Sequence, residues 1–301
     1  VIEITGRITV MRQGKVVAER ANAGDLSKAE LARLMCGREL RPPEKPPTTP
    51  GAPLLVLDHV STAGGAGSAL KDVSLTLREG EIVGIAGVSG NGQRELADVV
   101  AGVLAPSQGT IAVDGTPVTV PGPRAMQARK VGRVPEDRLA IGMIGALPLA
   151  ESMALPWIGE APFSRHGILD RDAIRRFAAD QIAAFDIRTP GPEARTGTLS
   201  GGNLQKALLA REIAREPKIL LAAQPTRGID VGATEFVHGQ FLALRAKGGA
   251  ILLISEDLEE IFALSDRIAV MYGGRIVADM PAAEATVERV GLAMAGVAEA
   301  A

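Results

Sequence analysis

The stretch Leu199-Ser200-Gly201-Gly202-Asn203-Leu204-Gln205-Lys206 places a hydroxyl and two glycines directly before a helical pattern. Leu204, Ala207 and Leu208 follow the i, i+3, i+4 spacing of a buried helix face, and Ser200 stands at the N-cap position. Two glycines at a helix start let a phosphate approach bare backbone N–H groups at the positive end of the helix dipole. The octet therefore indicates either a phosphate site or an ordinary Ser-Gly-Gly turn.

The composition limits the class of protein. The chain has 301 residues, 46% of them hydrophobic, so it can bury the core of one large domain or two ordinary ones. Its formal net charge is −2 and only 3% of its residues are aromatic, which argues against a nucleic-acid partner. The single cysteine, Cys36, cannot form an internal disulfide and fits a reducing compartment.

The sequence carries no metal-binding or membrane-spanning pattern. His59, His166 and His238 lie far apart and none has a metal-ligand spacing, so we expect no zinc site. No apolar run approaches the roughly 18 residues of a membrane span, and residues 1–7 lack a signal-peptide pattern. A membrane role is therefore expected only through a partner.

The sequence of residues 7–17 returns, with substitutions, at residues 267–277. The match continues more loosely between residues 31–37 and 290–296. We interpret residues 1–40 as the C-terminal tail of a preceding copy, in a chain cut from a longer tandem protein. The alternative interpretation is two unrelated hairpins, each followed by a helix.

Six prolines within residues 41–53 predict a stiff, extended linker between the two copies. We expect the second copy to occupy residues 54–301. Within it, a helical subdomain is expected over about residues 140–215 and would carry the octet.

A mostly parallel core sheet flanked by helices is expected, because three continuous apolar runs lie between helical patterns. These runs are residues 81–87, 218–223 and 250–254. A small antiparallel layer is expected from residues 54–60, 73–77 and 109–120. One helix is expected to bury Leu96, Val99, Val100 and Val103, and an amphipathic helix is expected over residues 170–185.

A second glycine-rich motif, Gly87-Val-Ser-Gly-Asn-Gly-Gln-Arg94, follows a predicted strand and opens a predicted helix. That is the context of a phosphate-binding P-loop, G-x-x-x-x-G-K-[ST]. Farther along, one apolar strand ends in Gln224-Pro-Thr-Arg-Gly-Ile-Asp230 and another ends in Ser255-Glu-Asp257. In this order and spacing, residues 54–296 resemble the nucleotide-binding domain of an ABC transporter ATPase, with the octet as its signature motif.

The resemblance implies an ABC-type P-loop NTPase fold that binds ATP and Mg²⁺. In that family two domains close head to tail, and each ATP lies between the P-loop of one domain and the signature of the other. The nucleotide contacts implied for this chain are Gly87, Ser89, Gly90, Asn91, Gly92, Gln93 and Arg94 in the P-loop, and Ser200, Gly201, Gly202 and Gln205 in the signature. Within the family, residues 134–138 and 222–233 look most like the nucleoside or simple-sugar importers.

Several positions depart from the family pattern in ways that weaken the chain's own ATP site. Gln93 replaces the P-loop lysine and carries no charge, and Arg94 replaces the Mg²⁺-binding hydroxyl. Ala223 replaces the carboxylate near the metal, and Gln224 replaces the glutamate that acts as general base. A glutamine amide cannot accept a proton at neutral pH. We therefore expect negligible ATP hydrolysis and weak or absent Mg²⁺ binding.

Three further positions of the family pattern complete the predicted site. Glu256 stands where the family has its switch histidine, and Glu136 where it has the Q-loop glutamine. Asp230 matches the family's loop after the catalytic strand. Residues 61–70 lack the aromatic that usually stacks on adenine. The signature thus matches while the P-loop site is degenerate.

The resemblance implies an ATP-binding subunit of a nucleoside or simple-sugar importer. The asymmetry predicts that this domain lends its signature, in trans, to a catalytic site in the first ABC domain. The implied partners are that first domain, transmembrane permease subunits and, indirectly, a substrate-binding protein. The implied location is the cytoplasmic face of the inner membrane. Residues 135–165 are expected to contact the permease through Met143, Ile144, Leu147, Leu149 and Trp157, with a local mini-core as the alternative.

Two other functions remain open from the sequence. One is an ABC ATPase outside transport that acts on ribosomes or DNA, which the slight net acidity and the residues Ala223 and Gln224 disfavour. The other is a structural module that no longer binds nucleotide when isolated.

Overall fold

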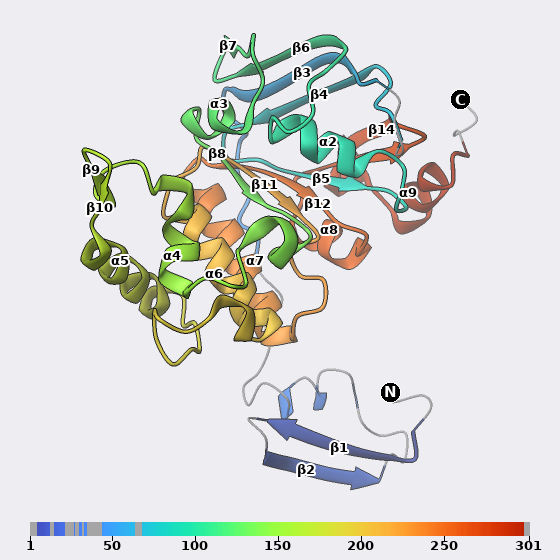
Figure 1. The fold of residues 1–301 in the computed structure, drawn as a ribbon. Helices are drawn as coiled ribbons and strands as arrows, with labels where there is room; N and C mark the ends of the chain where they lie inside the picture. Colours follow the sequence, from blue (N-terminus) through green and yellow to red (C-terminus); the bar gives the residue numbers. More distant parts are fainter. Residues whose placement is uncertain are drawn as a thin grey trace.

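The computed structural model describes residues 5–12, 15–21, 27, 30–31, 33–34, 44–63 and 68–297 (Figure 1). In this part of the chain, a six-stranded sheet has the order β14-β13-β5-β12-β11-β8. Its strands are β5 (Ile82–Ala86), β8 (Val131–Val134), β11 (Ile219–Ala223), β12 (Ala250–Ile254), β13 (Arg267–Tyr272) and β14 (Arg275–Pro281). Neighbouring strands run parallel except for β14, which pairs antiparallel with β13.

The second sheet is antiparallel and has the order β4-β3-β6-β7. Its strands are β3 (Pro53–Ser61), β4 (Val73–Arg78), β6 (Gln108–Val113) and β7 (Thr116–Pro117). Figure 1 shows α2 (Gln93–Val100) between this sheet and the core sheet. There Leu96, Val99 and Val100 join the apolar side chains of both sheets in one buried cluster. The predicted pair of layers is therefore present, with a helix between them.

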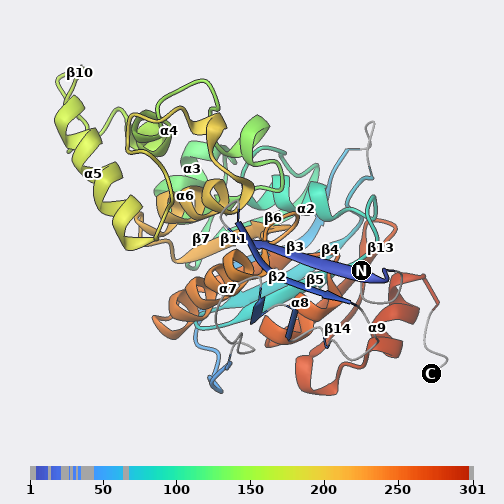
Figure 2. The ribbon, with the colours of Figure 1, turned by 90° about the horizontal axis from the view of Figure 1, so that it is seen from below.

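The opposite face of the core sheet is covered by helices. These are α4 (Leu149–Ala154), α5 (Arg171–Ala184), α6 (Gly201–Ile213), α7 (Val231–Ala246), α8 (Leu258–Leu264) and α9 (Val287–Met294), with α3 (Pro123–Ala128) beside β8. Figure 2 shows that α4 and α5 project to one side of the sheet, next to α6. Asp170 begins α5 by accepting a hydrogen bond from the backbone N–H of Ala173. The predicted helix over residues 170–185 is thus observed as α5.

Short elements complete the chain between α3 and α9. They are a π-helical turn (Arg138–Gly142), 3-10 turns (Leu155–Trp157, Thr196–Thr198 and Ala282–Glu284) and the strand pair β9 (Ser164–Arg165) and β10 (Ile168–Leu169).

Four predictions about individual apolar residues are wrong. Val103 lies beyond the end of α2 and is 55% exposed, because the helix ends at Val100. Met143 and Leu149 are buried in the core between the sheet and the helices, so they do not form a surface. Trp157 also packs there, stacked on Phe163. For Met143, Leu149 and Trp157, the alternative prediction of a local mini-core is therefore correct.

The sequence repeat is also a repeat of backbone geometry. The strands β1 (Arg7–Arg12) and β2 (Lys15–Ala21) pair with the same register and the same bulge as β13 and β14, displaced by 260 residues. Ile8 and Val10 are buried against Ala18, Leu31 and Leu34. The Ser27 hydroxyl then accepts from the N–H of Glu30, as the Thr286 hydroxyl accepts from the N–H of Arg289. Two copies of one hairpin are therefore present, each followed by a hydroxyl that accepts from the N–H three residues later.

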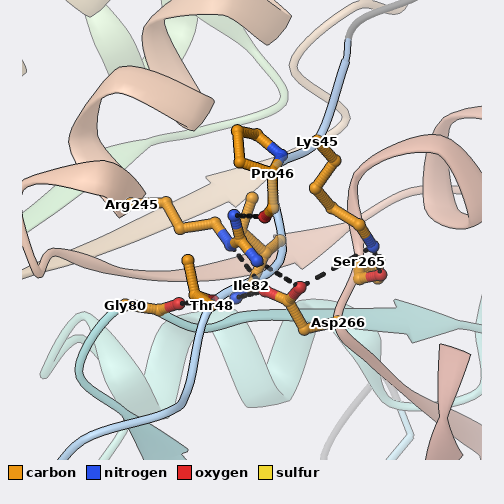
Figure 3. Close-up of polar contacts among 8 residues, drawn as sticks. All are labelled: Lys45, Pro46, Thr48, Gly80, Ile82, Arg245, Ser265 and Asp266. Carbon is orange, nitrogen blue, oxygen red and sulfur yellow. Dashed lines mark hydrogen bonds and ion pairs between the residues drawn. The ribbon is translucent and has the colours of Figure 1, made fainter.

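The proline-rich segment lies against the domain as a strap, defined here as residues 44–52 (Figure 3). Arg245, at the end of α7, donates to the carbonyl of Pro46 at 2.8 Å and to both carboxylate oxygens of Asp266 at 2.7 and 2.8 Å. Lys45 donates to the carbonyl of Ser265, and Thr48 donates to the carbonyl of Gly80 at 3.0 Å. Burial lowers the pKa of Lys45, although the neighbouring Asp266 opposes this shift.

Candidate functional site

A cleft of about 1120 Å³ opens at the carboxyl ends of the parallel strands. Ligands of open α/β sheets bind at this end, because the loops that follow the strands converge there. The cleft lies between the P-loop, the segment after β8, the start of α6, and the ends of β11 and β12. Its lining includes Ser89, Gly90, Gln93, Arg94, Glu136, Gly201, Gln224 and Glu256, all of which the sequence singled out. Residues far apart in the chain thus line one cleft.

The P-loop joins β5 to α2 through glycines that its geometry requires. Gly90 and Gly92 have φ of +88° and +107°, which favour glycine. A Cβ at Gly87 would lie 2.4 Å from Nε2 of Gln93 and 2.9 Å from the carbonyl oxygen of Met271. The side chain of Asn91 ties the loop to the turn between β13 and β14, because its Oδ1 accepts from the N–H of Gly273 at 2.9 Å.

The side chain of Gln93 is folded back onto this loop. Its Nε2 donates to the carbonyl of Val88 at 2.9 Å, and its Oε1 accepts from the backbone N–H of Asn91 at 3.1 Å. Arg94 is directed elsewhere: its side chain is 85% exposed and lies 4.0 Å from Asp98. In a P-loop, backbone N–H groups hold the phosphates. Here one of these groups already has a partner within the loop.

The strand end that would carry catalytic carboxylates holds Ala223 and Gln224. Gln224 has a positive φ of 47°, and its Oε1 accepts from the backbone N–H of Glu256 at 3.3 Å. The structure thus brings these two predicted site residues together. Ala223 offers no side-chain oxygen to a metal, and the described residues contain no group of three or more His, Cys, Asp or Glu suited to a metal ion.

An arginine pair crosses the cleft and ties three segments together. Arg138 donates through Nε to Oε1 of Gln205 at 2.7 Å and through Nη2 to the carbonyl of Arg227. Arg227 in turn pairs with the carboxylate of Glu136. Burial lowers the pKa of Arg138, and the nearby Asp137 opposes this shift. Glu136 and Gln205 are therefore engaged by side chains that sequence reasoning missed, because spacing along the chain does not show this pairing.

A buried carboxylate links the loop after β11 to two helices. Glu260 of α8 is 3% exposed, and its Oε1 accepts from the hydroxyl of Thr226 at 2.8 Å and lies 2.9 Å from Nε2 of His238 on α7. This contact fixes Thr226, two residues after Gln224, against α7 and α8. Sequence reasoning also missed Glu260, since an acidic residue on a short helix carries no signal of burial.

The signature octet begins α6 as predicted. Ser200 occupies the N-cap position, but its side chain makes no capping hydrogen bond. A Cβ at Gly202 would lie 3.1 Å from the Cβ of Ala233 and 3.2 Å from Oδ2 of Asp230, so a glycine is favoured there. Asp230 itself is the N-cap of α7 and accepts from the N–H of Ala233 at 2.9 Å. Asp230, at the start of α7, therefore lies close to the start of α6.

Comparison with known proteins identifies the family. The ABC transporter family model matches residues 70–227, which is more than half of the chain. The chain belongs to the ABC transporter family. Solved ATP-binding cassettes of this family have the same fold: the ADP- and phosphate-bound dimer of the cassette MJ0796 matches 76% of this chain and 99% of its own, with a TM-score of 0.65 and 23% identity. The predicted ABC-type P-loop fold is thus confirmed.

Curated relatives in the ABC transporter family match nearly the whole chain. The guanosine import ATP-binding protein NupO of Bacillus subtilis is 42% identical over 97% of this chain and 58% of its own length. The glucose import ATP-binding protein TsgD13 of Haloferax volcanii is 44% identical over 97% of this chain and 54% of its own length. A ribose import ATP-binding protein, RbsA 1, of Rubrobacter xylanophilus is 41% identical over 98% of this chain. The chain spans between 54% and 58% of the length of NupO and TsgD13.

In the described part of this ABC family member, no helix is long and apolar enough to cross a membrane.

Proposed function

We propose that this chain is the ATP-binding part of an importer for nucleosides or simple sugars. Three relatives named for guanosine, glucose and ribose import support this, each at least 41% identical over 97% or more of the chain. The proposal includes transmembrane permease subunits and a substrate-binding protein as partners, at the cytoplasmic face of the inner membrane.

The chain's own cleft is a degenerate ATP site. Gln93 engages the P-loop that would hold the phosphates, and Ala223 and Gln224 supply neither a metal carboxylate nor a base. Arg227 pairs with Glu136 and so neutralises one of the two acidic side chains that would face the γ-phosphate. Glu256 is left at the switch position as an anion. ATP and Mg²⁺ would bind here weakly, and hydrolysis would be negligible.

The signature acts instead on an ATP held by a first ABC domain. The observation that carries this proposal is the start of α6, where an exposed hydroxyl at Ser200 precedes the helix and Gly201 and Gly202 are its first two residues, with no capping hydrogen bond from the N-cap side chain. Such an end presents N–H groups to an anion. The repeated hairpin of residues 7–21 supports a preceding copy, with residues 1–40 as its tail, residues 41–53 as the linker and residues 54–301 as the second domain.

A surface patch supports contact with a permease. Leu139, Ile141 and Ile144 are 45%, 53% and 43% exposed on the π-helical turn beside the cleft and just after it. Three large apolar side chains exposed within residues 139–144 favour a protein partner. Since Met143 and Leu149 are buried, the proposed contact is restricted to these three residues and the adjoining surface.

The test is ATPase activity of the full-length protein reconstituted with its permease. Ser200→Ala removes one donor to the γ-phosphate, and losing such a preorganised donor costs about a hundredfold in turnover. Lys218→Ala is the control, because it removes only an exposed ion pair with Asp114. Undiminished turnover in Ser200→Ala would contradict the role of the signature in trans.

A further inference from the structure

The hydroxyl of Ser200 is held by a side chain one turn into the same helix. Its Oγ accepts a hydrogen bond from Nδ2 of Asn203 at 2.9 Å. Asn203 is fixed at its other end, because its Oδ1 accepts from the backbone N–H of Arg188 at 2.8 Å. The amide of Asn203 therefore bridges the backbone after α5 and the hydroxyl at the start of α6.

This bridge determines which way the Ser200 proton points. The N–H of Arg188 can only donate, so the amide oxygen of Asn203 must face it and the amide nitrogen must face Ser200. The nitrogen can only donate as well, so the Ser200 oxygen accepts and its own proton remains for another acceptor. Within the described residues no acceptor for that proton is found, and Ser200 is exposed.

The same contact accounts for the open end of α6. A serine at an N-cap ordinarily accepts from an N–H in the first turn of its helix. Ser200 makes no such bond, and its oxygen is engaged by Asn203 instead. The first-turn N–H groups are thus left uncapped by a side chain, and the hydroxyl is left with a proton to give. Both features favour a negatively charged group placed against this end.

We propose that Asn203 is a positioning residue that orients the Ser200 hydroxyl to donate to a phosphate oxygen of the nucleotide held by the partnering domain. The inference rests on the proposed role of the signature in trans. A hydroxyl that is oriented before the nucleotide arrives needs no reorganisation when charge develops on the phosphate. Asn203 thus acts through Ser200 and does not touch the nucleotide itself.

Asn203→Asp isolates this role, because it keeps the acceptor for the N–H of Arg188 and replaces only the donor that faces Ser200. A carboxylate oxygen can only accept, so the Ser200 hydroxyl would turn inward and donate to it. In the reconstituted full-length protein we expect kcat to fall to within about threefold of Ser200→Ala, which is itself about a hundredfold low. KM for ATP and the thermal unfolding midpoint should change little.

A double-mutant cycle separates positioning from direct repulsion between the new carboxylate and phosphate. If Asn203→Asp acts through Ser200, the double variant Ser200→Ala/Asn203→Asp has the turnover of Ser200→Ala alone. If the fold-loss of turnover in the double variant equals the product of the two single losses, the two residues act independently and the inference is overturned. Wild-type turnover in Asn203→Asp would overturn it as well. If Ser200→Ala itself keeps full turnover, the proposed function fails and the inference fails with it. If only Asn203→Asp keeps turnover, the proposed function stands and the inference alone fails.

Discussion

The side-chain oxygen of Gln93 accepts a hydrogen bond from the backbone N–H of Asn91 at 3.1 Å, within the loop expected to cradle phosphate. A lysine, which has no acceptor, could not make this bond. The substitution therefore does more than remove a charge, since it also places a competing acceptor inside the loop. The same N–H also donates to the carbonyl of Val88 at 3.3 Å, so a phosphate that enters must compete with the amide of Gln93 and with this carbonyl for Asn91.

Removing this competing acceptor should strengthen nucleotide binding. A hydrogen bond of this kind contributes about 0.5–1.5 kcal/mol, so we expect Gln93→Ala to bind ADP about threefold more tightly than the wild type. Gln93→Lys restores the charge as well and should gain about tenfold or more. Isothermal titration of the purified chain measures both, with Lys218→Ala as the control. Weaker binding in Gln93→Ala would show that the amide serves as a ligand, and no binding by any variant would favour the structural module.

The isolated chain should release phosphate from Mg·ATP at a negligible rate. Gln224 cannot accept a proton and Ala223 cannot hold a metal, so the attacking water has neither base nor metal support. Steady-state phosphate release measures this directly. Turnover near about 1 s⁻¹, at the low end of ordinary enzymes, would show that another group supplies the base.

The sequence predicts the core of this fold well, because each central strand is a continuous apolar run. The run at residues 250–254 is observed as β12 with these bounds, and residues 218–223 contain β11. In irregular chain, apolar residue type alone does not predict which side chains are buried. The sequence predicts a permease contact for both Met143 and Ile144, yet Met143 is buried and Ile144 is 43% exposed.

The candidate site is predicted in its backbone motifs and missed in its side-chain pairing. Glycines and strand ends mark the P-loop and the signature, since their geometry is local. The contact from Arg138 to Gln205 spans 67 residues, and that from Thr226 to Glu260 spans 34. Such pairs form only when the sheet assembles, and no periodicity along the chain reveals them.

The exposed apolar turn should crosslink to a permease. Ile141 and Ile144 lie on the surface, so a cysteine introduced as Ile141→Cys or Ile144→Cys is accessible. A short bifunctional reagent should join either cysteine to the membrane subunit in the assembled transporter. A cysteine at the exposed position Ile168 of β10, which lies outside this patch, is the matched control. Crosslinks from Ile168 and none from Ile141 would place the permease contact at the β9–β10 hairpin instead.

The strap depends on the buried guanidinium of Arg245, whose side chain is 2% exposed. Arg245→Lys keeps the charge but cannot reach Pro46 and both oxygens of Asp266 together, so it should lower the free energy of unfolding by about 2 kcal/mol. Arg175→Lys changes an exposed pair with Glu193, and exposed pairs contribute little to stability, so its effect should be much smaller. Urea denaturation compares the two. Equal effects would show that the strap contact adds nothing.

A buried acid directly before β5 should make stability depend on pH. Glu81 is 3% exposed, and burial raises the pKa of its carboxyl above 4.5, although Arg267 and the N–H of Arg78 oppose the shift. As pH rises from about 4.5, the unfolded chain loses this proton before the folded chain does. The folded state then binds more protons, so stability falls with rising pH until the folded pKa is passed.

Glu81→Gln removes this titration while keeping an acceptor for the N–H of Arg78, which Oε2 of Glu81 accepts at 2.9 Å. The free energy of unfolding of Glu81→Gln relative to the wild type should therefore increase as pH rises from 4.5 across the window of the raised pKa, and then level off. Urea titrations between about pH 4 and pH 8 measure this difference. Glu193→Gln, at an exposed carboxylate, is the matched control. A difference for Glu81→Gln that stays flat across this range would show that the carboxyl titrates alike in the folded and unfolded chains.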